Sequence, residues 1–381
     1  MGPIAKRALN IPPFIVMDVL ERAREMEREG RKIIHLEVGE PDFPTPQCIS
    51  EAAVKAIHDG YTHYTESLGL VELRKAICSL YYEKYNVDIG PDRIIITSGT
   101  SPAIFMLFSS LLEQKDEIIL SNPHYACYPN FATFFGAIPV FVNVYEEDGF
   151  QYRPEDIKAK ISNRTRAVLI NSPSNPTGNL LFPDRMKEIA GLGPYVISDE
   201  IYHGLVYEDR EHSILEFTDK AFVLNGFSKL YAMTGWRLGY VIAPPEFIRP
   251  MQKIQQNFFI SAGSVSQWAG IAALTKAGKD VQQMRSTYNK RRQYMIQRLR
   301  DLGFGITVEP QGAFYVLVNA RHLCASSYDL AFDILERAEV GVTPGIDFGQ
   351  NAEGYIRFSY ANSIDNIKEG LDRIENFLRN L

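Results

Sequence analysis

One lysine stands where its amine could act as a nucleophile. Lys229 follows the apolar run Phe222–Leu224, with Phe227 and Tyr231 close to it in the chain. Apolar surroundings lower the pKa of a lysine because they disfavour the charged form, and a neutral amine is a nucleophile. The alternative is an ordinary surface lysine whose carbon chain lies along apolar groups while its charge stays in water. The pattern makes Lys229 a candidate catalytic amine.

Acidic and amide side chains follow two other apolar runs. Asp199 and Glu200 come directly after Tyr195–Ser198, and Asn175 lies in the segment SNPTG that follows Ala167–Ile170. A carboxylate at the end of a buried strand is costly unless a cation pairs with it. Asp199 therefore indicates a cationic ligand group or a buried arginine. A helix cap and a turn would explain the same residues without any ligand.

Two arginines and one hydroxyl-rich segment could bind anions. Arg237 lies in TGWRLGY, and Arg357 lies in the apolar strand YIRFSYA. An arginine in apolar surroundings favours a planar anion such as a carboxylate, or a phosphate. The segment Ser98–Ser101 opens a predicted helix at Pro102, where backbone N–H groups and hydroxyls are suited to an anion. The alternatives are structural ion pairs and simple capping of that helix.

Seven short apolar runs position these side chains. They are continuous rather than alternating, which is typical of strands covered on both faces. The runs are Arg93–Thr97, Glu117–Leu120, Pro139–Val144, Ala167–Ile170, Tyr195–Ser198, Phe222–Leu224 and Leu238–Ile242. Helical patterns lie between most of them, which predicts an α/β fold with a mostly parallel seven-stranded sheet sandwiched by helices. Such sheets bind ligands outside the carboxyl ends of their strands.

The ends of the chain have a different pattern. Before the sheet we expect helices and one strand, over Met17–Glu29, Ile33–Val38 (the strand), Pro46–His58 and Leu70–Tyr85. After Pro244 a helical stretch runs to Leu302, interrupted at Ser261–Ser264 and Gly278, and smaller elements follow at Ile306–Val318 (strand-rich), Tyr328–Glu339 (helix), Tyr355–Ser359 (strand) and Ile364–Leu378 (helix). This predicts an N-terminal arm with part of a small domain (1–45), a large domain (46–280) and a small α+β domain (281–381).

Composition excludes several classes of protein. The 381 residues carry a net charge of −6, from 40 Lys and Arg against 46 Asp and Glu, whereas a nucleic-acid binder would carry a basic stripe. Four scattered cysteines without a CxxC pair predict reduced thiols, and seven histidines without ligand spacing predict no metal. No signal-peptide pattern and no apolar run of about 18 residues occurs, so we expect a cytoplasmic protein.

Seven motifs occur together in a characteristic order: VGEPDFPTP (38–46), YTESLGLVELR (64–74), SGTSPA (98–103), SNPTG (174–178), SDEIY (198–202), FSKLYAMTGWRLGY (227–240) and YIRFSYA (355–361). In type and order they resemble the class I/II aminotransferases of the aspartate aminotransferase superfamily, and the resemblance covers nearly the whole chain. A lysine and an acid for a pyridinium nitrogen are the signature of pyridoxal phosphate enzymes. The resemblance therefore implies the fold-type I architecture, pyridoxal 5'-phosphate as cofactor and a homodimer.

The resemblance also implies a role for each candidate residue. Lys229 resembles the lysine that holds the cofactor covalently and then moves the substrate proton, and Asp199 resembles the acid that keeps the ring nitrogen protonated. Asn175 and Tyr202 resemble the pair that binds the cofactor's phenolic oxygen. The remaining matches concern the phosphate (Gly99, Thr100, Ser101, Arg237, and Tyr64 from across the dimer), the face of the ring (Tyr125) and the substrate α-carboxylate (Arg357, helped by the N–H of Gly39).

One position departs from the family pattern. Many members have a hydroxyl three residues before the lysine, where it contacts the phosphate, and this chain has Gly226 there. Ser228 directly precedes the lysine instead, so its place among the phosphate ligands stays open.

The activity expected from the resemblance is transfer of an amino group from an α-amino acid to a 2-oxo acid, 2-oxoglutarate or pyruvate, in two half-reactions. The arm contains Phe14, Ile15, Val16 and Met17, and Ser101 stands where some acid-selective relatives have a basic residue. We therefore expect a neutral or aromatic amino donor. The alternatives are an aspartate aminotransferase, or a C–S lyase or other carbanion enzyme on the same scaffold. The arm could also serve only to pack against the small domain.

Overall fold

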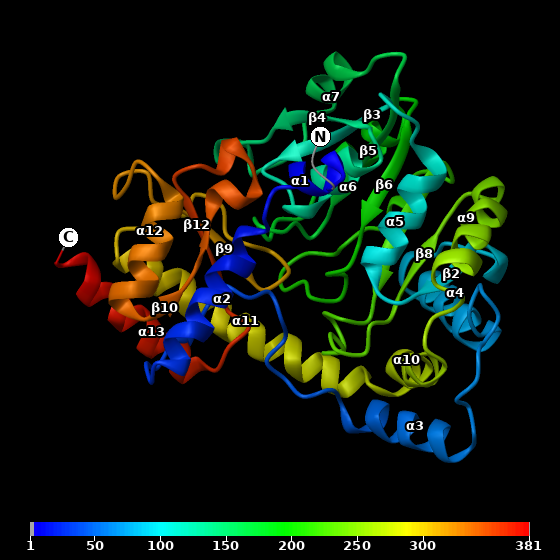
Figure 1. The fold of residues 1–381 in the computed structure, drawn as a ribbon, viewed down its shortest axis with the longest axis horizontal. Coiled ribbons are helices and arrows are strands. Elements are labelled where there is room, and N and C mark those ends of the chain that lie inside the picture. The colour runs from blue at the N-terminus through cyan, green and yellow to red at the C-terminus, as the bar shows by residue number, and fades with distance from the viewer. Residues whose placement is uncertain (1–3, 381) are drawn as a thin grey trace.

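The computed structural model describes residues 4–380, which form a large seven-stranded sheet and a smaller sheet region with helix α11 running between them (Figure 1). The large sheet has the strand order β2-β8-β7-β6-β5-β3-β4. All neighbouring strands in it are parallel except β8, which is antiparallel to both β2 and β7. Its strands are β2 (Ile94–Thr97), β3 (Glu117–Asn122), β4 (Ile138–Asn143), β5 (Thr165–Asn171), β6 (Tyr195–Asp199), β7 (Ala221–Gly226) and β8 (Gly239–Ile242). The predicted fold class is confirmed.

Helices bury both faces of this sheet. Ile94 and Ile96 belong to the apolar cluster that contains Leu73, whereas Ile95 belongs to the cluster that contains Leu107 on the other side. Successive side chains of a strand point to opposite faces, so a continuous apolar run is what a doubly covered strand requires. The helices of this region are α3 (Gln47–His58), α4 (Val71–Tyr85), α5 (Thr100–Leu111), α6 (Cys127–Phe134), α7 (Pro154–Lys160), α8 (Pro183–Ala190), α9 (Pro245–Phe258) and α10 (Ser264–Lys276).

The smaller region contains a three-stranded antiparallel sheet in the order β11-β12-β9, with bounds β9 (Tyr315–Asn319), β11 (Thr343–Pro344) and β12 (Tyr355–Ser359). A separate two-stranded sheet also belongs to this region: the N-terminal strand β1 (Ile34–His35) pairs in parallel with β10 (Val340–Gly341). Its helices are α11 (Gly278–Asp301), α12 (Ser327–Asp333), which continues into a π-helical turn over Ile334–Ala338, and α13 (Ile364–Leu378).

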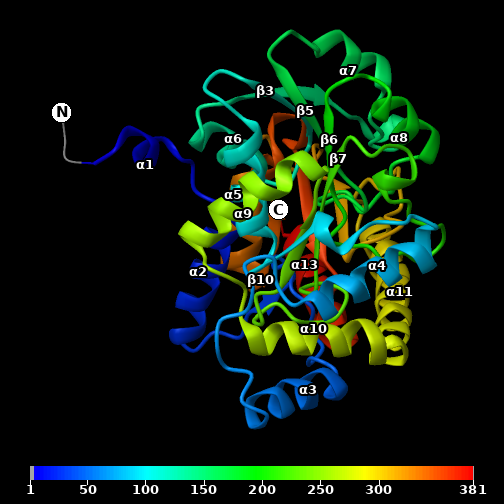
Figure 2. The same cartoon turned by 90° about the vertical axis from the view of Figure 1, so that its right-hand side faces the viewer.

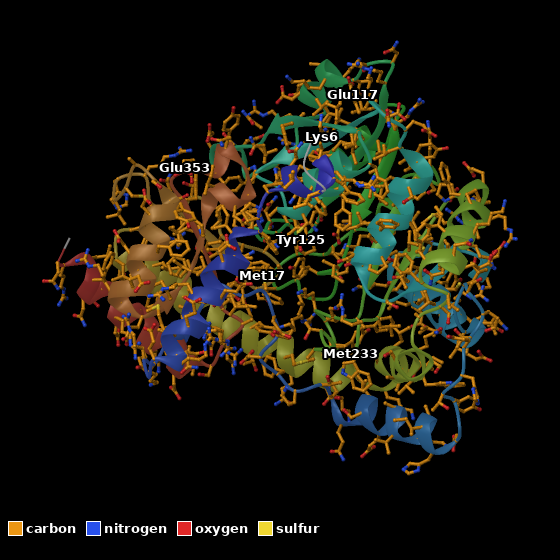
Figure 3. The ribbon with its side chains drawn as sticks, viewed as in Figure 1. Lys6, Met17, Glu117, Tyr125, Met233 and Glu353 are labelled. Carbon is orange, nitrogen blue, oxygen red and sulfur yellow. The ribbon has the colours of Figure 1, made fainter. Side chains whose placement is uncertain are left out.

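The N-terminal arm lies beside the smaller region. Helix α2 (Ile15–Arg28) packs Val19, Ala23 and Met26 against Leu335. The short helix α1 (Lys6–Asn10) has no buried residue and projects from the molecule (Figure 2), with the guanidinium carbon of Arg7 5.5 Å from the ring centre of Phe134. In Figure 3, Met17 of α2 and Tyr125 of the sheet region lie near the centre of the molecule, where the two regions meet.

Two sequence predictions were too long. The strand expected over Ile33–Val38 is regular only at Ile34–His35, since its partner β10 has only two residues. The strand-rich segment expected over Ile306–Val318 contains a regular strand only from Tyr315, and only isolated bridges such as Val206 with Gly312 precede it. Pro310 and Gly312 interrupt that segment, and proline cannot donate a ladder hydrogen bond.

Other elements differ by less. The helix expected to begin at Pro102 begins at Thr100, and the long stretch after Pro244 is three helices separated near the two predicted interruptions. Short 3₁₀ helices, which have no sequence pattern of their own, occur at Pro91–Arg93, Glu146–Asp148, Ile214–Glu216, Gly345–Phe348 and Gln350–Ala352. No helix of residues 4–380 combines the length and the apolar character needed to cross a membrane.

Candidate active site

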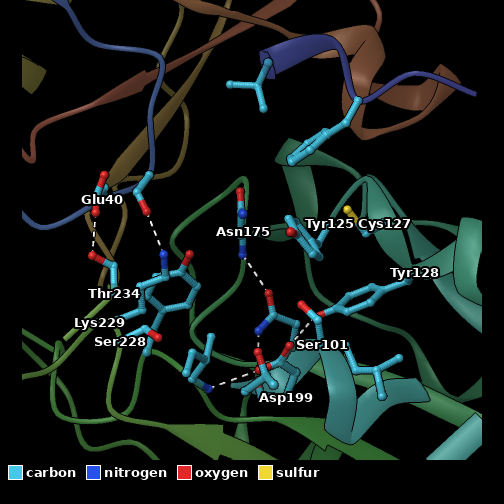
Figure 4. A pocket seen from close by; sticks show the side chains of 18 of the residues that line it. Glu40, Ser101, Tyr125, Cys127, Tyr128, Asn175, Asp199, Ser228, Lys229 and Thr234 are labelled. Carbon is cyan, nitrogen blue, oxygen red and sulfur yellow. Dashed lines mark hydrogen bonds between the residues drawn. The ribbon is translucent and has the colours of Figure 1, made fainter. Parts of the chain in front are cut away.

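A pocket of about 470 Å³ lies where the carboxyl ends of the sheet strands meet the arm and the smaller region. Its wall contains three of the arm residues singled out from the sequence, Phe14, Val16 and Met17, and eleven of the expected cofactor and substrate residues: Gly39, Thr100, Ser101, Tyr125, Asn175, Asp199, Tyr202, Ser228, Lys229, Arg237 and Arg357. Gly99 is adjacent to the wall through Thr100, and Tyr64 is outside it, with 81% of its surface exposed. Figure 4 shows Lys229, Asp199, Asn175 and Tyr125 around the same space.

Lys229 lies three residues after β7. Its ammonium donates a 2.6 Å hydrogen bond to the carbonyl oxygen of Gly39. The side chain is half-buried by surface area, but dense packing around the amine lowers its pKa to about 8. The negative charge of Glu40 opposes this shift, and the positive charges of Arg357 and Arg237 support it. Lys229 is therefore much closer to neutrality at physiological pH than an ordinary lysine is.

Asp199 ends strand β6 and is buried. Burial raises the pKa of its carboxyl to about 6, against the hydrogen bonds that stabilise its charge. Tyr128 donates its hydroxyl to Oδ2 at 2.6 Å, and the N–H of Ile201 donates to Oδ1 at 3.1 Å. Of the two partners expected from the sequence, a buried arginine is not the one used: within residues 4–380 the carboxylate accepts only from Tyr128 and the Ile201 N–H, and the cation that acts on it is Lys229. The carboxylate could therefore pair with a cationic ligand.

Arg357 comes from β12 and is 3% exposed. One terminal nitrogen donates to Oδ1 of Asn175 at 2.8 Å, and the other donates to the carbonyl oxygen of Glu37 at 2.6 Å and to the hydroxyl of Thr343 at 3.1 Å. All of these acceptors are neutral, and the buried Nε has no partner in the described chain. A buried guanidinium that holds only neutral oxygens is well suited to a planar carboxylate.

Aromatic rings fix Arg357 in place. Its guanidinium carbon lies 4.2 Å from the ring centre of Tyr315 and 4.8 Å from that of Phe348. Tyr315 also shares a 2.9 Å hydrogen bond between hydroxyls with Tyr202. Burial raises the pKa of Tyr202 far above its ordinary value, so its phenol stays protonated and can donate.

The beginning of helix α5 provides a second anion-binding surface. Gly99 precedes the helix with a φ of +96°, and a Cβ there would lie 2.5 Å from Nη2 of Arg237. No side chain of residues 4–380 caps this helix, so its first N–H groups and the Thr100 and Ser101 hydroxyls can serve a ligand. Arg237 adopts a φ of +49° and uses one terminal nitrogen to donate to the carbonyl of Thr234 at 2.9 Å. Its other nitrogens add positive charge beside the helix start.

Two tyrosines and one asparagine make further contacts at this site. Tyr128 is the hydroxyl donor to Asp199, and it supports Tyr125 edge-on at 5.3 Å between ring centres. Tyr315 supports both Tyr202 and Arg357, and Asn171 links Asn175 to β6 by accepting the Asn175 N–H at 2.8 Å and donating to the carbonyl of Asp199 at 2.9 Å. Asn171 comes directly after an apolar run, as Asp199 does, so its position could be recognised in the sequence. Tyr128 and Tyr315 have no such position, and only the structure reveals their contacts.

Comparisons with known proteins agree with this geometry. The family model described as Aminotransferase class I and II matches residues 31–374. A (5-formylfuran-3-yl)methyl phosphate transaminase of Methanocaldococcus jannaschii is 45% identical over 379 residues, covering 98% of this chain and 99% of the relative. An aspartate aminotransferase of Pyrococcus horikoshii is 41% identical over 384 residues, covering 98% and 97%.

Two solved structures share the fold over nearly the whole chain. The aspartate aminotransferase from Thermus thermophilus with maleate has a TM-score of 0.95 at 35% identity, covering 99% of this chain and all (100%) of that one. A crystal structure from Methanococcus jannaschii, described as similar in its active site to kynurenine aminotransferases, has a TM-score of 0.92 at 44% identity, covering 98% and 100%.

Proposed function

Because this chain belongs to the class I and II aminotransferases, and is therefore a pyridoxal phosphate enzyme that moves amino groups, we propose that its amino donors are neutral or aromatic α-amino acids. We further propose 2-oxoglutarate or pyruvate as the acceptor. The observation that carries the proposal is the set of positive charges in the pocket: among its lining residues these are Lys229, Arg237 and Arg357.

The residues of the pocket fit pyridoxal phosphate. The phosphate suits the open start of helix α5 with Arg237, where the space beside Gly99 admits no Cβ. The ring nitrogen suits Asp199, whose buried carboxylate has only neutral donors. When bound, the cofactor supplies an aldehyde carbon and an electron-accepting ring. Lys229 is the amine that would hold that carbon, and we place Thr100, Ser101 and Ser228 around the phosphate.

The protein's own groups perform the proton chemistry. A lysine with a pKa of about 8 exists in part as the free amine near neutral pH, so Lys229 can take a proton from the substrate α-carbon and return it. Asp199, with a pKa of about 6, is ionised at pH 7 and favours a protonated ring nitrogen next to it. Tyr202 and Asn175 would donate to the phenolic oxygen, and Arg357 would bind the substrate α-carboxylate.

In this assignment Lys229 transfers the α-proton, Arg237 binds the cofactor phosphate and Arg357 binds the α-carboxylate. None of these groups distinguishes one amino acid substrate from another. A side-chain carboxylate would then meet the apolar arm residues Phe14, Val16 and Met17, or Glu40, which carries the same charge. An uncompensated carboxylate in such surroundings is unfavourable, whereas an apolar side chain gains from burial. Glutamate remains a suitable common donor if its longer side chain reaches solvent, since Arg357 binds only the α-carboxylate.

A second candidate is aspartate aminotransferase activity. It is favoured by relatives with that name, such as the Pyrococcus horikoshii protein at 41% identity. A partner subunit could supply a cation that this chain does not place in its own pocket. The test is kcat/KM for alanine, leucine, phenylalanine, tyrosine, aspartate and glutamate with each acceptor. A preference for aspartate over every neutral donor would contradict the proposal and support the second candidate.

We also propose a homodimer in which Tyr64 reaches the phosphate of the other subunit. The high exposure of Tyr64 in the single chain (81%) and its position outside the pocket support this. The test uses heterodimers of Tyr64→Phe and Lys229→Ala subunits. If Tyr64 acts across the interface, the one site with Lys229 also has Tyr64, and it should retain cofactor as the wild type does. Weakened retention at that site would show that Tyr64 acts within its own subunit, or that other contacts are disturbed.

We propose that the enzyme works in the cytoplasm. Its four cysteines are all free and half-buried, as expected for a protein in a reducing compartment. Fractionation of source cells with activity measurements in each fraction tests this, and activity confined to a membrane or secreted fraction would contradict it.

A further inference from the structure

The arm helix α2 is capped by a residue from the far end of the chain. Its own N-cap residue, Phe14, has no side-chain hydrogen bond to offer. Instead Asp347, which lies in the 3₁₀ helix Gly345–Phe348, accepts the N–H of Ile15 at 3.0 Å and that of Val16 at 3.3 Å. Asp347 is 8% exposed, so these contacts are shielded from water. A carboxylate at a helix start binds the free N–H groups and suits the positive end of the helix dipole.

The turn that Asp347 caps forms one wall of the active site. Phe14, Val16 and Met17 all line the pocket. The ring of Phe14 meets Tyr125 edge-on, with 5.9 Å between ring centres. Three apolar side chains of the pocket wall therefore depend on the position of a single helical turn.

The rest of α2 is held independently. Arg22 donates to Glu336 at 2.6 Å, and Val19, Ala23 and Met26 belong to the cluster with Leu335. Loss of the cap should therefore loosen the first turn and leave the remainder of the helix in place.

The residue after Asp347 connects the same segment to two other parts of the site. The Phe348 ring lies 4.8 Å from the guanidinium carbon of Arg357, and its carbonyl accepts the N–H of His124 at 3.0 Å. His124 directly precedes Tyr125. The pair Asp347–Phe348 thus links the arm, the carboxylate-binding arginine and the loop that carries Tyr125.

We propose that Asp347 is a positioning residue that sets the preference for large apolar amino donors, by holding the first turn of α2 against the pocket. Asp347 itself does not line the pocket. It acts through Phe14, Val16 and Met17, whose contact with the substrate side chain grows with the size of that side chain. This inference rests on the proposed use of neutral or aromatic donors.

The effect should appear as a change in selectivity. Replacing an N-cap side chain by alanine typically shifts the equilibrium of a helix end by roughly 2- to 30-fold. For Asp347→Ala we expect kcat/KM for phenylalanine and leucine to fall by about that factor, mainly through KM. The value for alanine, whose methyl group is too short to need the arm, should change less than about twofold. Hydrogen exchange at the Ile15 and Val16 amides should become faster.

Two further variants make the test specific. Asp18→Ala removes another acid from the first turn of α2 without removing the cap, so it should keep the wild-type selectivity. Phe14→Ala should lower the ratio of phenylalanine to alanine kcat/KM, and combining it with Asp347→Ala should give less than the sum of the two losses, because both act on the same wall. If Asp347→Ala does not fold, Asp347→Asn, which keeps one acceptor oxygen, should give an intermediate ratio.

The outcomes separate this inference from the proposed function. A wild-type enzyme that prefers aspartate to every neutral donor would contradict the proposed function. A wild-type enzyme that prefers phenylalanine, combined with Asp347 variants whose phenylalanine-to-alanine ratio is unchanged, would overturn the role of Asp347. Faster exchange at Ile15 and Val16 without a change in that ratio would also overturn it, because the cap would then be structural only.

Discussion

The charge of Asp199 offers a sharp test of the proposed mechanism. Asp199→Asn keeps the size of the side chain and an oxygen that can still accept the 2.6 Å hydrogen bond from Tyr128, so the variant should fold. It removes the negative charge, whose two hydrogen-bond donors in the described chain, Tyr128 and the Ile201 N–H, are neutral. A protonated ring nitrogen would then lose the anion that favours it.

The expected magnitude follows from this environment. Burial raises the pKa of Asp199 to about 6, which shows that its charge is poorly solvated. A poorly solvated charge interacts strongly with a cation brought into contact with it. Loss of one such preorganised electrostatic contact typically slows a reaction by roughly 10²–10³-fold. We expect a decrease of that size in the rate of proton abstraction, with a much smaller loss of cofactor affinity because the phosphate contacts remain.

The assay is a single turnover of the cofactor-loaded enzyme with an amino acid, followed by the cofactor's absorbance, together with a cofactor titration. Tyr128→Phe is the matched variant. It keeps the charge and removes one hydrogen bond to it, so its rate should lie between wild type and Asp199→Asn. Near-wild-type turnover in Asp199→Asn with cofactor fully bound would refute the reasoning, and so would a defect confined to cofactor binding.

Three further predictions concern the same pocket. Borohydride reduction and peptide mapping should label Lys229, and a label on another lysine would contradict the assignment. Capture of phosphate-free pyridoxal by cofactor-free enzyme should rise through pH 8 rather than 10.5, because the amine is neutral above its lowered pKa. Arg357→Leu should raise KM for amino and oxo acids by at least about 30-fold, since removing one partner of a buried charged contact costs roughly 2–5 kcal/mol. Arg237→Leu should instead weaken cofactor retention, and the reverse pattern of defects would exchange the two roles. Gly39→Ala should lower the free energy of unfolding by about 1–3 kcal/mol, because its Cβ would lie 1.8 Å from the Tyr315 hydroxyl and overpack the site. In thermal unfolding, adding Tyr315→Phe should restore part of this stability, and a Gly39→Ala variant as stable as the wild type would contradict the geometry.

Much of the fold could be predicted from local patterns. All seven strands of the large sheet were placed in the right segments, since an apolar run that must be covered on both faces is visible in the sequence itself. The strand Tyr355–Ser359 and the helix Ile364–Leu378 were placed with their observed bounds. The arm helix expected over Met17–Glu29 is observed at Ile15–Arg28, but its contact with Asp347 has no sequence pattern. The division at residues 45 and 280 stays a prediction.

What the sequence by itself determined is the set of chemical groups and the strand ends that carry them. Lys229, Asp199, Asn175 and Arg357 stand out as candidates because polar residues that follow or interrupt buried strands are costly without a partner, and the resemblance of their motifs to a known family gave each a role. The tertiary structure decided which groups meet: that Tyr128 and not an arginine supports Asp199, that Lys229 donates to the carbonyl of Gly39, and that Asp347 caps a helix 332 residues before it. Such contacts leave no periodic signal, because they join segments far apart in the chain, and only the packing of the two regions brings them within hydrogen-bond distance.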